Sequence, residues 1–348
     1  EFLSNNIIDE YNESKESFKK CFNENQDFLY SLFNIENFNF YECSYHGFKN
    51  TFENLIPEAY LHLKALDNLF NNINVNNVIT IRNRRIFDRA VNLKSYELNI
   101  ENYILLHSNV GKTSKFINEM GHLGHIKNAF VWNDFQSNAI KKSKYTNIIN
   151  YYTYGSPLFD SIKLNSKNNL NDNKSIFIPG GTIKYSKKLI YSLINKVQIN
   201  HKYRINIKYH PNDSTDQFLF LEKKKNIEIF NRFENIIKII SKSKLMITDL
   251  SESSILAMIL NKPVFFISVN DYISSLFNDI YYFNKVETNI FCFNNLQKLS
   301  KSVDLIMNDT QYYKKVVNIQ KKYIENFISK QNFHIDECSN KIDKILNA

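Results

Sequence analysis

The sequence is poor in cysteine and in long apolar runs, and each shortage narrows the possible functions. Its four cysteines are scattered without a Cys-x-x-Cys pair, which argues against a disulfide framework or a zinc site and favours a reducing compartment. No apolar run approaches the ~20 residues that a membrane-spanning helix needs. No signal peptide is visible either. We therefore expect a cytoplasmic protein.

Acidic residues are fewer than basic ones, 35 against 44, which gives a formal net charge of +9. Such a surface suits nucleic acid, an anionic membrane or an anionic small substrate. The sequence has no zinc finger, RNP-like aromatic motif or arginine-rich arm, so we expect no nucleic-acid partner. Lysines recur on the last helical stretch and predict a solvated helix face. Peripheral contact with the inner face of the cytoplasmic membrane is the alternative.

Glycine and proline are also scarce, with seven and five residues in 348. A chain this poor in them keeps glycine where the backbone needs positive φ or close approach, and proline where a turn must be stiff. Three groups directly follow short β-rich runs, and a fourth precedes one. Ligands of open α/β sheets bind beyond the carboxyl ends of the strands, so these groups indicate where a site is built. They are Gly155-Ser156-Pro157, Pro179-Gly180-Gly181, His210-Pro211 and Lys262-Pro263.

Short β-rich runs alternate with helical spacings along the chain, which predicts an α/β fold with parallel sheets. In the first part we expect helices at 10–34, 51–71, 84–94 and 134–140, the last capped by Asp134, and strands at 38–43, 78–81, 103–106 and 129–132. In the second part we expect strands at 175–178, 203–209, 226–230, 244–248 and 264–268. Each of these five strands precedes a helical stretch, which is typical of a doubly wound domain.

The stretch 164–174 is polar and lacks apolar periodicity, so it predicts a linker. The predicted fold class is α/β, with two Rossmann-like doubly wound domains that face a cleft. The first covers residues 1–163 and the second residues 175–310, and residues 311–348 form closing helices. Clefts at domain interfaces are preferred ligand sites.

A serine-rich turn follows the strand predicted at 244–248. Thr248 and Asp249 end the strand, and Ser251, Ser253 and Ser254 open the next helix. Free N–H groups and hydroxyls at such a helix start suit a phosphate. The alternative is that Ser251 only caps the helix.

Two further turns lie at the ends of neighbouring predicted strands. Pro211 restricts His210, which suits an imidazole held over a cleft as a phosphate donor or an acid. Gly180 and Gly181 permit close approach to a ligand, and Thr182 is placed to start a helix. The full GxGxxG fingerprint is missing, so a dinucleotide cofactor is not expected.

A cluster of polar residues follows the third predicted strand of the first part. His107, Glu119, His122 and His125 fall within nineteen residues. Without a pattern of further ligands we expect no metal here. A general base, His107 or Glu119, is one interpretation, and helix-surface polarity is the other.

Taken together, these motifs resemble GT-B transferases that build bacterial surface polymers. They are similar to the group of CDP-glycerol glycerophosphotransferases and of capsule and lipooligosaccharide glycosyltransferases. The resemblance covers about residues 75–270. It rests on Val131-Trp132-Asn133-Asp134 with Gly155-Ser156-Pro157 through Asp160, on Lys208-Tyr209-His210-Pro211, and on Thr248-Asp249-Leu250-Ser251 through Lys262-Pro263. The His210 and Ser253-Ser254 motifs are also similar to those of bacterial sialyltransferases.

The resemblance implies a metal-independent glycosyltransferase without a cofactor. The first domain takes a glycan or lipid-linked acceptor, and the second binds a nucleotide-activated donor, with CMP- or CDP-linked donors favoured. The donor-binding residues are Gly180, Gly181, Thr182, His210, Pro211, Thr248, Asp249, Ser251, Ser253 and Ser254, and the catalytic candidates are His210, His107 and Glu119. The alternatives are a CDP-glycerol-type glycerophosphotransferase, a UDP-sugar epimerase of the same fold, and a non-catalytic assembly protein at the membrane.

Overall fold

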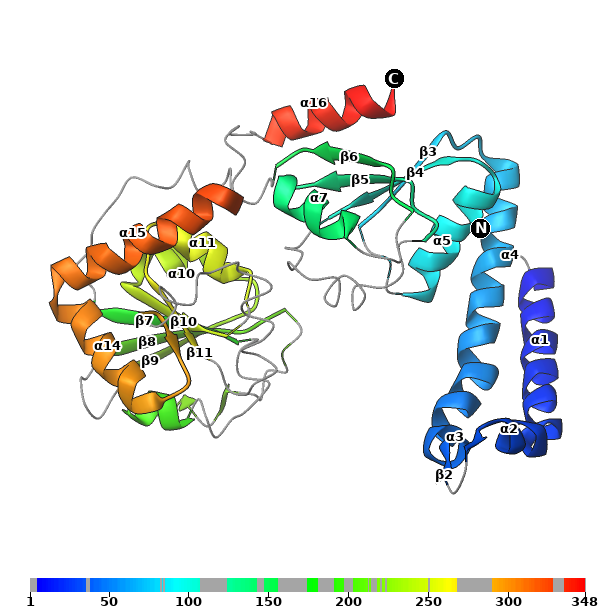
Figure 1. The fold of residues 1–348 in the computed structure, drawn as a ribbon, viewed down its shortest axis with the longest axis horizontal. Helices are drawn as coiled ribbons and strands as arrows, with labels where there is room; N and C mark the ends of the chain where they lie inside the picture. Colours follow the sequence, from blue (N-terminus) through cyan, green and yellow to red (C-terminus); the bar gives the residue numbers. More distant parts are fainter. Residues whose placement is uncertain are drawn as a thin grey trace. The chain divides into compact units, whose positions relative to one another are not determined.

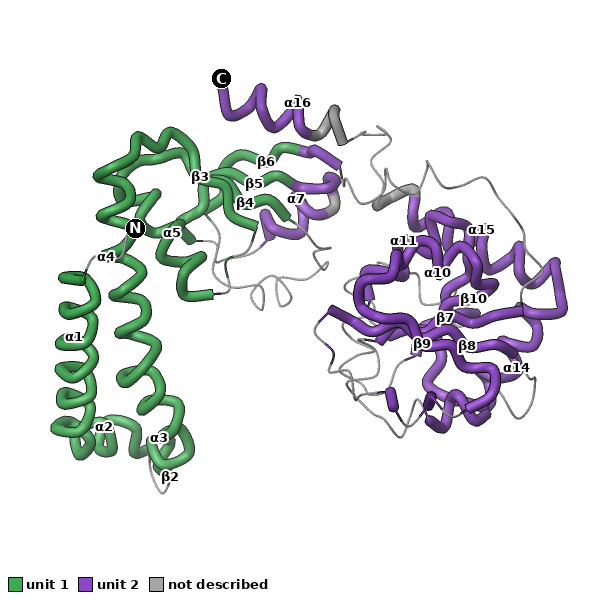
Figure 2. Tube along the Cα trace, turned by 180° about the vertical axis from the view of Figure 1, so that it is seen from behind, with its two compact units in different colours: residues 1–106, 118–130, 143–152 green, residues 107–117, 131–142, 153–348 purple. Residues whose placement is uncertain are grey.

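A computed structural model gives the structure of the protein. It describes residues 5–35, 38–81, 83, 85–106, 124–142, 147–155, 174–180, 191–196, 203–211, 213, 218–219, 221–222, 224–249, 251–267, 290–327 and 335–347. The chain forms two compact units (Figure 2). Unit 1 comprises residues 1–106, 118–130 and 143–152, and unit 2 comprises residues 107–117, 131–142 and 153–348.

Unit 2 is built around a six-stranded sheet in which every neighbouring pair of strands is parallel. The strands are β7 (Ser175–Pro179), β8 (Arg204–Lys208), β9 (Ile227–Phe230), β10 (Leu245–Thr248), β11 (Val264–Ile267) and β12 (Cys292–Phe293). Every residue of β7, β10 and β11 is buried. Burial on both faces explains why these strands are continuous apolar runs in the sequence. The five predicted strands are confirmed, and β12 is an addition.

The strand order is β12-β11-β10-β7-β8-β9. The chain starts in the middle at β7, runs outward to β9, and then returns to the other side of β7 with β10. This is the doubly wound order, and the direction reverses between β7 and β10. Ligands of such sheets bind at the carboxyl ends of the strands beside this reversal.

Helices cover the second sheet (Figure 1). They include α10 (Ile236–Lys242), α11 (Ser253–Ile259), α14 (Leu296–Asn308) and α15 (Thr310–Phe327). Val316 and Ile324 of α15 are buried in the same core as the strands. The amide of Gln320 also accepts from Val264 N at 2.9 Å and donates to Val264 O at 2.6 Å. Helix α15 is therefore part of the core of unit 2. The last described helix is α16 (Ile335–Leu346).

The first sheet has four strands in chain order, β3 (Asn77–Thr80), β4 (Glu101–Leu105), β5 (Asn128–Val131) and β6 (Asn150–Thr153). The pairs β3–β4 and β4–β5 are parallel. Helix α5 (Ile86–Glu97) connects β3 to β4, and α7 (Asp134–Lys141) follows β5. The prediction that Asp134 caps this last helix is wrong. Asn133 is the N-cap, and its Oδ1 accepts from Gln136 N at 3.0 Å.

Four buried asparagines and the exposed Asn150 link the elements of the first sheet through their side-chain amides. Asn92 of α5 donates to Asn83 Oδ1 at 3.2 Å, and Asn102 of β4 donates to Asn92 O at 3.4 Å. Asn128 of β5 donates to Asn102 O at 3.1 Å, and Asn150 of β6 donates to Asn128 Oδ1 at 2.8 Å. We call these five residues the asparagine ladder. Because buried amides need partners, the ladder fixes the loop after β3 against the sheet.

A helical hairpin precedes the first sheet. It comprises α1 (Asn5–Glu24), α2 (Gln26–Leu32), the two-residue strands β1 (Asn34–Ile35) and β2 (Phe38–Asn39), α3 (Phe40–Asn50), a π-helical turn at Thr51–Leu55, and α4 (Ile56–Asn72). Helices α1 and α4 lie side by side (Figure 1). The prediction of a strand over 38–43 is wrong beyond Asn39. The Asn39 side chain accepts from Tyr41 N at 2.8 Å and thereby caps α3.

Candidate functional site

Three loops gather at the carboxyl edge of the second sheet. They follow β8, β7 and β10, which are neighbours in that order. Because strands lie about 4.8 Å apart, the ends of β8 and β10 flank the end of β7 at a separation of about 10 Å. The fold therefore brings Gly180, the His210–Pro211 turn and the Thr248–Ser254 turn to one edge, beside the point where the strand order reverses.

Gly180 is buried directly after β7 and is crossed closely by the turn that follows β8. A β-carbon on Gly180 would lie 2.5 Å from Asp213 Oδ2, 2.5 Å from Lys208 O and 2.7 Å from His210 N. Two of these three atoms are backbone, so they cannot rotate away. Only glycine fits between the two loops at this position.

The His210 turn is closed by Asp213. His210 N donates to Asp213 Oδ2 at 2.7 Å, and Asp213 N donates to His210 O at 2.9 Å. Asp213 is buried, whereas His210 and Pro211 are exposed. The other carboxylate oxygen, Asp213 Oδ1, is buried and has no hydrogen-bond partner in the part of the chain that the structure describes. A buried acceptor without a donor is costly, and such atoms often mark where a ligand binds.

A buried lysine lies beneath this turn. Lys208 Nζ donates to Arg232 O at 2.9 Å and to Tyr209 O at 3.3 Å. Burial lowers the pKa of Lys208, and the negative charges of Glu234 and Asp213 partly oppose that shift. Arg232 in turn donates to Pro211 O at 3.5 Å. The two cations thus hold the main chain of the loops after β8 and β9 in a fixed arrangement.

The serine turn after β10 uses part of its hydroxyl groups internally. Ser251 Oγ and Ser253 Oγ share a hydrogen bond of 2.6 Å, and Ser254 Oγ donates to Ser251 O at 2.6 Å. Ser254 is fully buried, so its hydroxyl supports the turn. Ser251 is the least buried of the three. The helix N-cap is Glu252, whose side chain does not cap the helix, and the interpretation of Ser251 as the cap is therefore wrong.

Thr248 and Asp249 are both buried at the end of β10. Among the described residues no three His, Cys, Asp or Glu side chains are grouped so that they could hold a metal ion. The edge therefore offers hydroxyl groups, an imidazole and one unpartnered carboxylate oxygen. Hydroxyls and an imidazole can donate to a phosphate, and a carboxylate can accept from a sugar hydroxyl.

Four of the predicted site residues lie outside the part of the chain that the structure describes. Gly181 and Thr182, which were predicted to contact the donor, lie outside the described residues, as do His107 and Glu119, the two candidate bases. The described part of the site therefore comes entirely from unit 2.

The structure gives a role to two residues that were not among the predicted site residues, Lys208 and Asp213. Lys208 is a buried charged residue at the end of β8, directly after Ile207, and a charge at the end of a β-rich run is a recognisable signal. Asp213 stands three residues after His210, a spacing at which a carboxylate can accept from the first backbone N–H of a turn.

No family model matches the sequence, and no curated protein matches it either. Solved structures do match. The UDP-GlcNAc 2-epimerase of Neisseria meningitidis, bound to UDP-GlcNAc, is 13% identical with a TM-score of 0.56, over 84% of this chain and 82% of that chain. MnaA of S. aureus, solved with UDP, is 14% identical with a TM-score of 0.55, over 83% and 79%. The wall teichoic acid polymerase TagF is 12% identical with a TM-score of 0.53, over 84% and 74%.

These similarities concern the fold. The chain has the GT-B fold of two α/β domains with parallel sheets, as the sequence predicted. The solved structures of similar fold include a UDP-GlcNAc 2-epimerase and a wall teichoic acid polymerase. No helix in the described ranges is both long enough and apolar enough to span a membrane.

Proposed function

We propose that the protein is a nucleotide-sugar enzyme whose donor phosphates bind at the carboxyl ends of β7, β8 and β10. The observation that carries the proposal is the convergence of Gly180, the His210–Asp213 turn and the serine turn beside the strand reversal. Its most specific form is a metal-independent glycosyltransferase that moves a sugar to a hydroxyl of a cell-surface glycan.

In this mechanism the turn residues stabilise the departing phosphate. Ser251 and Ser253 hydroxyls donate to phosphate oxygens, and the His210 imidazole donates a hydrogen bond or a proton to the leaving group. Because Asp213 and Lys208 fix the backbone around His210, these donors are preorganised, and preorganised donors act most strongly where negative charge develops. Asp213 Oδ1 accepts from a hydroxyl of the donor. The base that takes the acceptor proton, His107 or Glu119, is part of the proposal.

Two observations bear on which nucleotide the donor carries. The pairing of His210-Pro211 with a later serine motif favours a CMP- or CDP-linked donor. The solved structures of similar fold contain UDP or UDP-GlcNAc, which favours a uridine nucleotide. Thermal unfolding in the presence of CMP, CDP, UDP or GDP distinguishes the cytidine from the uridine hypothesis. The nucleotide that binds should raise the melting temperature, because a ligand at 100 times its Kd stabilises the native state by about 2.7 kcal/mol.

A second candidate is a UDP-sugar 2-epimerase. The similarity to the N. meningitidis epimerase over 84% of this chain favours it. A transferase releases nucleotide only when an acceptor is present or slowly by hydrolysis, whereas an epimerase converts the sugar with no acceptor at all. A CDP-glycerol-type glycerophosphotransferase, the further alternative that the sequence motifs suggest, differs in requiring CDP-glycerol as the donor.

The test is turnover of the stabilising nucleotide sugar by wild type, His210→Ala and Ser253→Ala. We expect His210→Ala to lower kcat by about 100-fold or more with an unchanged circular dichroism spectrum. His62→Ala is the matched control, because His62 pairs with Glu58 on α4 of unit 1. Equal turnover by His210→Ala and His62→Ala would remove His210 from the mechanism.

A further inference from the structure

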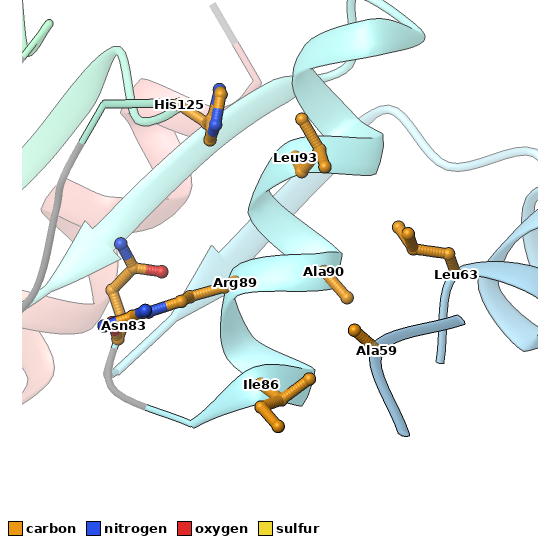
Figure 3. A pocket seen from close by; sticks show the side chains of 8 residues that line it. All are labelled: Ala59, Leu63, Asn83, Ile86, Arg89, Ala90, Leu93 and His125. Atoms are coloured by element: carbon orange, nitrogen blue, oxygen red, sulfur yellow. The ribbon is translucent and has the colours of Figure 1, made fainter. Parts of the chain in front are cut away.

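A cavity of about 390 Å³ lies between α4 and α5 in unit 1 (Figure 3), and none of the residues of the proposed donor site line it. This volume is within the range of ligand pockets. Ala59 and Leu63 of α4 form one wall, and Ile86, Ala90 and Leu93 of α5 form the other. The two alanines face a space that larger side chains would have filled.

The remaining wall of the cavity is polar. It consists of Asn83, Arg89 and His125. Arg89 reaches across to Asn83 (Figure 3), where its Nε donates to Asn83 O at 3.3 Å. Asn83 is a member of the asparagine ladder, and the main-chain oxygen of His125 accepts from Asn102 of the same ladder. Hydrogen bonds to the asparagine ladder therefore hold the polar wall in place.

The charge of Arg89 is not balanced by a carboxylate among the residues that the structure describes. The acidic side chains of α4 and α5 have other partners: Glu58 pairs with His62 at 3.5 Å, Asp67 with Lys94 at 2.7 Å, Glu97 with Lys94 at 3.1 Å, and Asp88 accepts from Arg85 N at 3.4 Å. The two terminal nitrogens of the Arg89 guanidinium have no hydrogen-bond acceptor in the described ranges. A planar guanidinium with free N–H groups suits a bidentate bond to a carboxylate or phosphate.

We propose that this cavity binds an amphiphilic anion, a phosphate or carboxylate that carries a short apolar chain. The anionic group pairs with Arg89 and bonds to the polar wall, and the apolar chain lies between the alanines and leucines of α4 and α5. An uncharged apolar ligand would leave Arg89 without a counter-ion, and a bare anion would leave the apolar walls hydrated. The proposal does not depend on the function of unit 2.

Isothermal titration calorimetry of the 348-residue chain with hexyl phosphate tests the proposal. Inorganic phosphate supplies the charge without the chain, and hexanol the chain without the charge. We expect each to bind at least about tenfold more weakly than hexyl phosphate, because charge-assisted bonds and apolar burial both contribute. Equal binding of inorganic phosphate and hexyl phosphate would overturn the proposal.

Two variants locate the site. Arg89→Gln should weaken hexyl phosphate binding by about tenfold or more and leave hexanol unchanged. Ala59→Leu, on the less buried wall, should weaken both ligands by filling the cavity. Arg204→Gln makes the same charge change in unit 2, where Arg204 pairs with Glu228 at 2.5 Å, and should have no effect. Circular dichroism and thermal unfolding establish that each variant folds, and Arg89→Lys replaces Arg89→Gln if the latter does not.

His210→Ala separates this site from the proposed donor site, which also takes phosphate. Hexyl phosphate binding that is lost in His210→Ala and kept in Arg89→Gln would overturn the proposal. Binding that is lost only in Arg89→Gln supports it, whether or not the nucleotide experiments succeed. Sedimentation with phosphatidylcholine vesicles, with and without phosphatidic acid, then tells a lipid source from a free metabolite. A lipid source requires Arg89-dependent sedimentation with phosphatidic acid.

Discussion

Gly180 and Asp213 meet at the edge of the second sheet, where a β-carbon on the glycine would lie 2.5 Å from the Asp213 carboxylate. The same carboxylate holds the backbone N–H of His210 at 2.7 Å. The shape of the loop after β7 and the shape of the turn after β8 therefore depend on each other. A change in either residue is transmitted to the position of His210.

Gly180→Ala should disturb both loops. The added methyl group overlaps Lys208 O and His210 N, so we expect the free energy of unfolding to fall by about 3 kcal/mol. Nucleotide binding should fall with it. Gly47→Ala is the matched control, because Gly47 lies in α3 with nothing within 4 Å of an added β-carbon. That change should stabilise by about 0.5–1 kcal/mol. Urea unfolding of both variants measures these changes. Similar changes in the free energy of unfolding for Gly180→Ala and Gly47→Ala would contradict the packing argument.

Asp213 allows the structural and ligand-binding roles of one carboxylate to be separated. Asp213→Asn keeps an oxygen for His210 N, so stability should change by less than about 1 kcal/mol, whereas Asp213→Ala leaves that N–H unbonded and should cost about 1–3 kcal/mol. If the buried Oδ1 accepts from a ligand, Asp213→Asn should still weaken donor binding. Asp309→Asn, at the N-cap of α15, provides the control. Normal donor binding by Asp213→Asn would assign Asp213 a structural role alone.

Tyr313 should make the protein less stable in alkali. Burial raises the pKa of Tyr313 from its ordinary 10.0 to about 12. Its hydroxyl donates to Asn261 O at 3.0 Å. The folded state keeps the proton where the unfolded state loses it, so stability is complete below pH 10 and falls towards pH 12.

The measurement compares wild type with Tyr313→Phe by urea unfolding across this pH range. Near neutral pH the wild type should be more stable by about 1 kcal/mol, because it has the additional hydrogen bond. As the pH approaches 12 this difference should change by about 2 kcal/mol, so that Tyr313→Phe becomes the more stable protein by about 1 kcal/mol. The difference between wild type and Tyr313→Phe at each pH removes the contributions of the other tyrosines, which the two proteins share. A difference that stays constant with pH would show that the Tyr313 hydroxyl ionises normally in the folded state.

Gln320 should be among the most sensitive positions on α15. Its amide satisfies both the N–H and the C=O of Val264, at the start of a buried strand. Gln320→Leu removes both partners and should cost about 2–4 kcal/mol. Gln311→Leu makes the same change on the exposed face of the same helix and should alter stability by less than about 0.5 kcal/mol. Thermal or urea unfolding distinguishes the two outcomes.

The sequence predicts secondary structure best where an element is buried, because burial requires a run of apolar residues. Strands β7, β10 and β11 are buried on both faces and were predicted nearly to the residue. Strand β12 has only two residues, too few to produce a pattern. The run from Phe38 was mistaken for a strand because its aromatic residues favour one, and the cap from Asn39 overrides that preference.

The site was predictable to a similar degree. Motif order and strand ends were enough to gather Gly180, His210 and the serine turn at one edge. The role of Asp213 depends on its contact with a glycine from another strand, and that of Lys208 depends on carbonyls from the loop after β9. Such contacts between distant segments leave no periodic trace in the chain. The same reason explains why the cavity beside Arg89 was not expected.

The pairing of Gln320 with Val264 also bears on how the chain is made. The partner of this strand is synthesised 56 residues after it. When β11 leaves the ribosome, α15, which supplies the hydrogen-bond partner of Val264, has not yet been released. Vectorial folding of unit 2 must wait for α15, so a nascent chain that stalls near residue 300 exposes an unfinished apolar flank to chaperones and proteases.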